Sequence, residues 1–326
     1  MLTNPAPDTP VSNGLEPAPF HAEVAEGPAG VKAWWVRASD GTRLRFGVWP
    51  EGPKGTVLMF CGRTEYVEKY GRVAADLAKA GYGMVSFDWR GQGLADRPQH
   101  EPGMGHVLSF DEYRWDVTAF RTALEDLGVP KPWYLIGHSM GGCIGLRALY
   151  DGLPVAAAAF TGPMWGIQLT PLLKLISPLL IGGSTLLGRD NRFALTTGPW
   201  KEEPFDGNIL TTDPDQYAYM NRQTAAHPEL TLGGPSFRWV AAAEEEAEAL
   251  MAMPPLDLPV VTIVGSDERR VSIDNARKRM DTWPRGEFVL VDGGRHEVLM
   301  ESPARRGQSL TAILDHFDAH RPDASA

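Results

Sequence analysis

Trp133-Tyr134-Leu135-Ile136-Gly137-His138-Ser139-Met140-Gly141-Gly142 is the stretch from which the fold of this chain is inferred. Its first four residues are apolar or aromatic and follow two prolines, which predicts a short buried strand. The residues from Cys143 to Tyr150 have helical spacing and end at Asp151-Gly152. A strand, a Gly-x-Ser-x-Gly turn and a helix together form a nucleophile elbow, which exposes the central serine at the end of a sheet.

The glycines of Gly137-x-Ser139-x-Gly141 have a steric reason. A strand that turns sharply into a helix strains the central residue, and side chains two positions to either side would collide. Glycine removes those side chains. The N-terminal N–H groups of the helix also point toward any anion that forms beside Ser139. We therefore interpret Ser139 as a nucleophile rather than as a residue of a purely structural turn.

Composition excludes several classes of function. The 326 residues carry a net charge of -10, so no basic patch is expected that could bind nucleic acid or an anionic membrane by charge alone. Two cysteines, Cys61 and Cys143, do not make a disulfide framework, which favours a reducing compartment. The first 20 residues lack the basic and apolar regions of a signal peptide, and no apolar run approaches 18 residues. A cytoplasmic, soluble protein is expected.

Short apolar runs alternate with helical patterns along most of the chain, which predicts an α/β fold with a mostly parallel sheet and helices on both faces. A hairpin is expected over 32–49, and the other predicted strands are 56–60, 84–87, 133–136, 155–160, 260–265 and 287–291.

The alternation is interrupted between Thr161 and Leu258, where many prolines separate short helical pieces. We interpret residues 162–235 as a cap inserted into one catalytic domain, which comprises residues 21–161 and 236–326. The proline-rich residues 1–20 are expected to form a disordered arm.

A serine nucleophile needs a base and an acid that orients the base. In an elbow enzyme these follow the serine in the order acid, then histidine. His296 fits the base because it follows the last predicted strand and two glycines. Glu268 and Asp267 are both candidates for the acid. Spacing favours Glu268, which lies three residues after Gly265 and three before Val271, and leaves Asp267 as the alternative.

The oxyanion of an acyl-transfer reaction needs backbone donors. The N–H of Met140, directly after the serine, is one candidate. The other is the N–H of Arg63, in the turn after the strand at 56–60. Asp88-x-Arg90-Gly91-x-Gly93 lacks the spacing of a phosphate-binding loop and is interpreted as structural. No cofactor and no metal are expected.

Four motifs of the chain together point to a known family: Gly137-His138-Ser139-Met140-Gly141-Gly142, Cys61-Gly62-Arg63-Thr64-Glu65-Tyr66, Asp88-Trp89-Arg90-Gly91-Gln92-Gly93 and Gly294-Arg295-His296-Glu297. By these motifs the chain resembles the monoacylglycerol lipase and lysophospholipase branch of the α/β-hydrolases, which is similar to the serine aminopeptidases. The resemblance covers residues 31–318 except the cap. It departs at Cys61, where the family usually has histidine, and at Glu268, where it usually has aspartate.

The resemblance implies a cofactor-independent serine hydrolase with a small-molecule or lipid ester as substrate, of lysophospholipid or monoacylglycerol type, acting through an acyl-enzyme. The leucine-rich stretch 169–181 is expected to pack on the catalytic domain, to line an acyl tunnel or to make transient contact with a lipid surface. Two alternatives remain open: an aminopeptidase or acyltransferase using the same site, and a non-catalytic ligand-binding protein. For a peptidase, acidic cap residues would hold the free amine, and Glu202, Glu203 and Asp206 are available.

Overall fold

The computed structural model describes residues 15–98, 100–168, 182–184 and 186–322. Within these residues a nine-stranded sheet has the order β1-β2-β3-β5-β4-β6-β7-β8-β9. The first three pairings in this order, β1 with β2, β2 with β3 and β3 with β5, are antiparallel. Every pairing from β5 through β4 to β9 is parallel. The strands are β1 (Glu16–Pro17), β2 (Lys32–Arg37), β3 (Arg43–Val48), β4 (Thr56–Phe60), β5 (Gly83–Asp88), β6 (Trp133–His138), β7 (Ala158–Thr161), β8 (Val260–Gly265) and β9 (Gly286–Val291).

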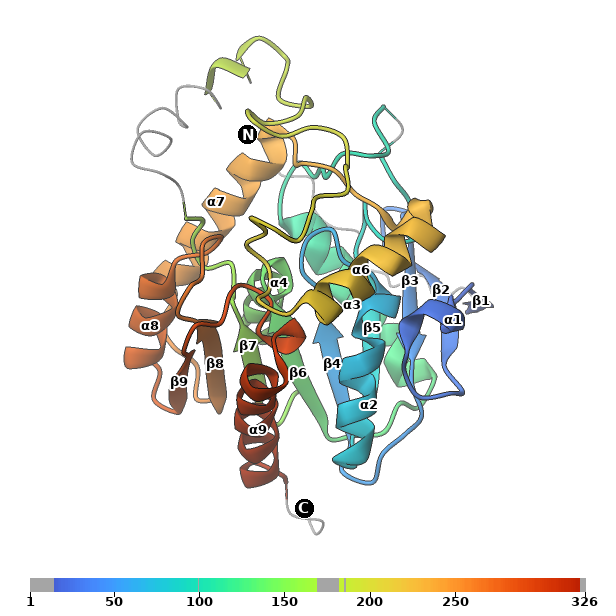
Figure 1. Cartoon of the computed structure of the whole chain (residues 1–326), viewed down its shortest axis with the longest axis vertical. Helices are drawn as coiled ribbons and strands as arrows, with labels where there is room; N and C mark the ends of the chain where they lie inside the picture. Colours follow the sequence, from blue (N-terminus) through green and yellow to red (C-terminus); the bar gives the residue numbers. More distant parts are fainter. Residues whose placement is uncertain (1–14, 99, 169–181, 185, 323–326) are drawn as a thin grey trace.

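Helices cover both faces of this sheet, as the alternation of patterns predicts. In Figure 1, α2 and α9 lie in front of the sheet and α3 and α4 lie behind it. The helices are α1 (Ala22–Ala25), α2 (Gly71–Lys79), α3 (Asp111–Asp126), α4 (Met140–Tyr150), α6 (Pro214–Ala226), α7 (Phe237–Ala252), α8 (Ile273–Asp281) and α9 (Pro303–Ala319). Three short 3-10 helices are η1 (Val67–Tyr70), η2 (Pro228–Leu230) and η3 (Val298–Met300).

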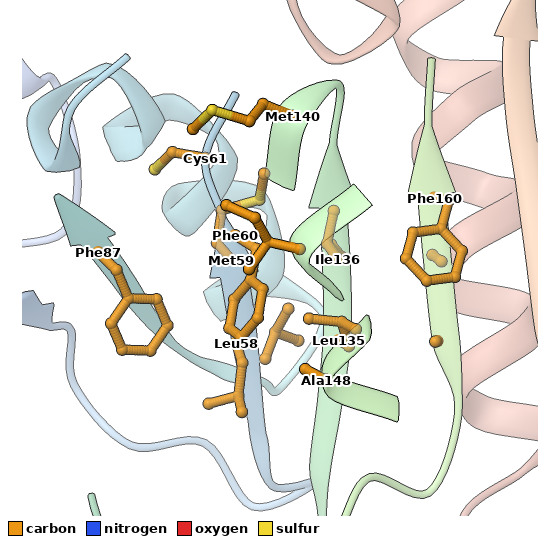
Figure 2. Close-up of a cluster of buried hydrophobic side chains, with 14 of the residues drawn as sticks. Leu58, Met59, Phe60, Cys61, Phe87, Leu135, Ile136, Met140, Ala148 and Phe160 are labelled. Atoms are coloured by element: carbon orange, nitrogen blue, oxygen red, sulfur yellow. The ribbon is translucent and has the colours of Figure 1, made fainter. Parts of the chain in front are cut away.

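The central strands β4 and β6 are buried along their whole length. A parallel strand that is covered on both faces needs apolar side chains at successive positions, which explains the continuous apolar runs in the sequence. Figure 2 shows the side chains of these strands packed against Phe87 of β5 and Phe160 of β7, with Cys61 and Met140 at the upper end of the cluster. This core holds the carboxyl ends of β4 and β6 next to each other.

The N-terminal segment differs from the prediction of a disordered arm over residues 1–20. Glu16 and Pro17 pair with Trp35 and Trp34 as the antiparallel edge strand β1, and Phe20 packs edge-on against Trp49. Proline is tolerated at the edge of a sheet because no further strand needs its missing N–H. Residues 15–20 are therefore part of the catalytic fold, and residues 1–14 lie outside the described residues.

Part of the segment between β7 and β8, including α6, lies above the carboxyl ends of the parallel strands in Figure 1, and α7 then descends beside the sheet and packs against α4. The segment contains α6, η2 and α7. The stretch 169–181, for which the sequence suggests an acyl tunnel or a lipid contact, lies outside the described residues. Within the described residues, none of the helices combines the length and the apolar character that crossing a membrane requires.

The elbow between β6 and α4 requires glycine at Gly141. A Cβ atom at this position would lie 2.0 Å from the carbonyl oxygen of Phe60, at the end of β4. At Gly137 it would lie 2.8 Å from the carbonyl oxygen of Gly141. The absence of a side chain at Gly141 thus lets the first turn of α4 approach the loop after β4, and its absence at Gly137 lets the same turn lie close to β6.

Replacing Gly141 by alanine is expected to destabilise the protein by roughly 3 kcal/mol or more, because backbone must move to admit the new methyl group. Gly307 of α9 is the matched control, since a Cβ there meets no atom within 4 Å. Gly307→Ala is expected to stabilise the protein by about 0.5–1 kcal/mol through helix propensity. Urea unfolding of the two variants measures both values, and a Gly141→Ala protein as stable as wild type would contradict the steric argument.

Candidate active site

Ser139 occupies the strained position that the elbow motif predicts. Its backbone has φ 51° and ψ -116°, a left-handed conformation that is rare for a residue with a side chain. Its N–H donates to the carbonyl of Thr161 at 3.1 Å, and its own carbonyl accepts from the N–H groups of Gly142 and Met164, both at 2.9 Å. These bonds hold the strained turn. Ser139 remains partly exposed between buried neighbours.

The structure brings Glu268 and His296 together. Nδ1 of His296 lies 2.6 Å from Oε2 of Glu268, and both side chains are buried. The other carboxylate oxygen, Oε1, accepts from the N–H groups of Arg270 at 2.6 Å and Val271 at 3.3 Å. Burial opposes ionisation, but the charge and hydrogen bond of His296 together with the two N–H groups outweigh it and lower the pKa of Glu268. The carboxylate is therefore ionised and fixed.

Asp267, the alternative acid, is not brought to His296. Its side chain is 37% exposed and forms an ion pair with Arg269 at 2.8 Å. The hydrogen bond from Arg269 lowers the pKa of Asp267. Of the two adjacent candidates, only Glu268 contacts the histidine.

The Glu268–His296 pair lies over the end of β7, the strand next to β6. A Cβ atom at Gly162, which follows β7 with φ +47°, would lie 3.2 Å from both Glu268 Oε2 and His296 Nδ1. The ring of His296 also lies 4.9 Å, between centroids, from the ring of His138, which directly precedes Ser139. An imidazole that donates Nδ1–H to a carboxylate presents Nε2 as an acceptor, and Nε2 of His296 has no hydrogen-bond partner among the described residues.

The loop after β4 is held by hydrogen bonds to three side chains. Trp89 Nε1 donates to the carbonyl of Cys61 at 2.9 Å, Gln92 donates to the carbonyl of Gly62 at 2.8 Å, and Glu65 accepts from the N–H of Gly62. In the described part of the chain, the N–H groups of Arg63 and Met140 are left without a protein acceptor. Since Gly141 allows the start of α4 to approach this loop, the two free donors belong to neighbouring segments, as an oxyanion hole requires.

A buried cluster of charges, which the sequence reasoning missed, lies beneath the site. Lys69 bonds Glu65, and its Nζ lies 2.8 Å from Oε1 of Glu297. His138 Nε2 lies 3.3 Å from the other oxygen of Glu297, and its Nδ1 lies 2.9 Å from the carbonyl of Thr161. Despite burial, the charges of Glu297 and Glu65 raise the pKa of His138. The cluster links the loop after β4, the elbow and the loop of His296.

Two groups of side chains have the spacing of metal ligands: Glu65, His138 and Glu297, and the partly exposed His21, Glu23 and His227. In the first group the ammonium of Lys69 already bonds both carboxylates and supplies the positive charge that a cation would bring. Burial opposes ionisation of Glu297, but Lys69 and His138 hold its pKa well below the usual range. The resulting stabilisation is present above the unfolded carboxyl pKa of about 4.3 and is lost as the pH falls toward the folded value.

Replacing Lys69 by methionine is expected to destabilise the protein by about 3–5 kcal/mol, because two buried carboxylates lose their shared counter-charge. Lys79, whose side chain is 79% exposed and pairs with Asp76 at 3.2 Å, is the control. Lys79→Met is expected to change the stability by less than about 0.5 kcal/mol. Chemical unfolding at neutral pH compares the two variants, and equal stabilities would show that the cluster does not depend on Lys69.

Asp88 and Arg90 are structural, as the sequence analysis proposed. Asp88 pairs with Arg45 at 2.6 Å and accepts the N–H groups of Val67 and Leu94. Arg90 pairs with Asp116 at 2.7 Å. These bonds brace the loops after β4 and β5 and place no charged group of this motif at Ser139.

Comparison with known proteins identifies the family of the chain. The model of the serine aminopeptidase S33 family of hydrolases matches residues 51–303. The chain is 31% identical to lysophospholipase L2 of Escherichia coli K12 over 277 residues, which is 81% of each chain. It is 28% identical to the probable lysophospholipase L2 of Haemophilus influenzae over 264 residues, 80% of this chain and 82% of that one. The chain belongs to the serine aminopeptidase S33 family of α/β-hydrolases.

Solved structures share the fold at low sequence identity. A soluble variant of monoglyceride lipase from Saccharomyces cerevisiae superposes with a TM-score of 0.67 at 21% identity, covering 88% of this chain and 95% of that one. A thermostable carboxyl esterase from Bacillus coagulans superposes with a TM-score of 0.71 at 16% identity, covering 90% and 100%. The α/β-hydrolase fold expected from the motifs is confirmed.

Proposed function

We propose that the protein is a serine ester hydrolase of the lysophospholipase and monoglyceride lipase type, with Ser139, His296 and Glu268 as its catalytic triad. The observation that carries the proposal is the buried hydrogen bond between His296 Nδ1 and Glu268 at the end of β7, beside the strand that ends in the strained Ser139. The lysophospholipase L2 relatives and the family match support the same reaction class.

In the proposed mechanism, Ser139 Oγ attacks the ester carbonyl while His296 Nε2 takes its proton. The carbonyl oxygen becomes an oxyanion, which accepts hydrogen bonds from the N–H groups of Met140 and Arg63. His296 then gives the proton to the leaving alcohol, and an acyl-enzyme remains on Ser139. Water, deprotonated by His296, attacks this acyl group and releases the fatty acid. The ionised Glu268 keeps Nδ1 protonated and stabilises the imidazolium that forms in both steps.

We further propose that residues 162–235 act as a cap that transiently contacts a lipid surface. The described part of this segment exposes large apolar side chains: Leu186 is 87% exposed and Leu187 is 69% exposed. Exposed apolar groups of this size favour contact with lipid. A cytoplasmic location remains a prediction, and the two free, buried cysteines are compatible with it.

The peptidase alternative gains no support from the cap. The acidic residues available to hold a substrate amine, Glu202, Glu203 and Asp206, are all exposed. A pocket for an amine would need a carboxylate within a recess near the nucleophile. Ester hydrolysis is therefore the function that the site supports best.

The proposal is tested by assaying the wild-type protein on p-nitrophenyl esters of 2 to 16 carbons, on monopalmitoylglycerol and on a palmitoyl lysophospholipid. We expect an optimum at medium or long chains and release of palmitate from at least one lipid. Activity confined to the acetate ester, or cleavage of peptide substrates only, would contradict it.

A further inference from the structure

Two histidines and a glutamate form a partly exposed cluster that the proposed reaction does not use. His21, Glu23 and His227 each offer one ligand atom, and these atoms all lie within 4.8 Å of one another. Nε2 of His227 lies 2.7 Å from Oε1 of Glu23, and the rings of the two histidines are stacked with their centroids 3.5 Å apart. Imidazole and carboxylate groups are ligands that zinc and similar transition metals bind well.

The cluster joins two segments that lie far apart in the sequence. His21 directly precedes α1 and Glu23 belongs to it, whereas His227 lies between α6 and η2 in the proposed cap, 204 residues after Glu23. The two segments are in contact through other groups as well, since Gln223 of α6 donates to the carbonyl of Val24 at 2.9 Å. The backbone therefore holds the three side chains close together before any ligand binds.

Within the described residues, no lysine or arginine neutralises the carboxylates of this cluster. Glu23 and the adjoining Glu229 form their ion pairs with the two histidines alone. The buried group beneath Ser139 differs, because the ammonium of Lys69 already stands where a cation would bind. Two protonated rings stacked face to face would repel each other, which favours a neutral imidazole that can act as a ligand. A divalent cation would balance the carboxylates with both rings neutral.

Glu229 has the position of a residue that supports a metal-bound histidine. Its Oε1 lies 3.2 Å from Nδ1 of His227 and 3.4 Å from Nε2 of His21. A histidine that binds a metal through one ring nitrogen generally donates its other N–H to a carboxylate, which fixes the orientation of the ring. Nε2 of His21 is buried and forms no hydrogen bond with the described part of the chain. A buried polar atom in this state calls for a partner.

We propose that His21, Glu23 and His227 bind one divalent transition-metal ion of the zinc type, which fastens the cap to α1. Glu229 orients His227 in this site. Magnesium and calcium prefer oxygen ligands alone and do not suit two imidazoles. None of these residues belongs to the proposed triad or oxyanion hole, so the inference goes beyond ester hydrolysis and does not depend on it.

The test is a calorimetric titration with zinc chloride of the full chain, without a histidine tag and freed of metal by EDTA and dialysis. We expect one zinc ion per chain and no binding of magnesium. Glu229→Gln is expected to weaken zinc binding about 10-fold, and His227→Gln more than about 100-fold, because losing a ligand costs more than losing its outer partner.

His100→Gln is the matched control. His100 also lies beside a second histidine, His106, with ring centroids 5.3 Å apart, but the two form no group of metal ligands with a carboxylate among the described residues. Its replacement is expected to leave the zinc affinity within about twofold of wild type. His227 is partly exposed, so its variant is expected to fold, which thermal unfolding in EDTA checks.

Hydrogen exchange followed by mass spectrometry tests whether the ion fastens the cap. Zinc is expected to slow amide exchange in α1, α6 and η2 of the wild type and to have no such effect in His227→Gln.

Three outcomes overturn the inference. The first is a wild-type protein that binds no zinc. The second is binding that His227→Gln leaves unchanged, which would assign the ion to other histidines, such as His296. The third is zinc binding that slows exchange in none of the three helices. Hydrolysis of esters by the metal-free wild type tests the proposed function separately, so its failure is distinguished from failure of the metal site.

Discussion

Replacing Ser139 by alanine is expected to lower kcat/KM for ester hydrolysis by about 10⁴- to 10⁶-fold. The variant keeps the oxyanion donors and the Glu268–His296 pair, but no nucleophile remains to form an acyl-enzyme. Since Ser139 is held by its backbone at φ 51°, its side chain is not needed for the turn. The stability should therefore change little, and hydrolysis of a p-nitrophenyl ester at saturating and limiting concentrations measures the loss.

A residual rate above about 1% of wild type would show that another group is the nucleophile. Contamination by host esterases is excluded if a mock preparation, purified in the same way from host cells that lack the variant, shows no comparable rate. The alanine protein also serves as the blank for every lipid assay described above.

Replacing Glu268 by glutamine is expected to lower kcat by about 10³- to 10⁴-fold. Glutamine keeps the size of the side chain but removes the charge that stabilises the imidazolium. Its amide can also donate to Nδ1, which would favour the unproductive tautomer of His296. The two side chains are joined by a hydrogen bond of 2.6 Å, so the loss of the charge acts directly on the ring of His296.

Asp267→Asn is the matched control for this variant, because Asp267 is the adjacent carboxylate and pairs with Arg269. It is expected to retain kcat within about threefold of wild type, as for an exposed surface pair. If Asp267→Asn lost more activity than Glu268→Gln, the assignment of the acid would be reversed.

Much of the fold could be predicted because local patterns and tertiary burial agree. The strands β4, β6 and β8 are largely apolar runs that follow a glycine or a proline, and the same runs are buried on both faces in the structure. The edge strand β1 could not be predicted, since Glu16–Pro17 has no β propensity and pairs only because β2 offers it an open edge.

Part of the candidate site could likewise be predicted from the sequence, and part could not. The positions of Ser139, Glu268 and His296 follow from sequence spacing, because each lies at a fixed offset from the end of a strand. The cluster of Lys69, Glu65 and Glu297 arises only when segments more than 200 residues apart fold together, and Lys69 beside Glu68 resembles an ordinary charged helix surface in the sequence. The sequence feature that could have indicated this cluster is Glu297, a carboxylate directly after the proposed base.

The Arg63 side chain shows the limit of motif reasoning most clearly. The motif assigns a role to its backbone N–H alone. Its side-chain hydrogen bond to the carbonyl of Gly233, 170 residues along the chain, becomes visible only when the loop after β4 and the segment before α7 are placed together.

The most direct test of the central claim is covalent labelling with a fluorophosphonate, followed by mass spectrometry of the intact protein and of its peptides. A serine activated by His296 and Glu268 reacts with this reagent, whereas an ordinary serine does not. We predict one adduct per chain, located on Ser139, and none in the Ser139→Ala variant. A wild-type protein that remains unlabelled, or that is labelled at another residue, would contradict the assignment of Ser139 as the nucleophile.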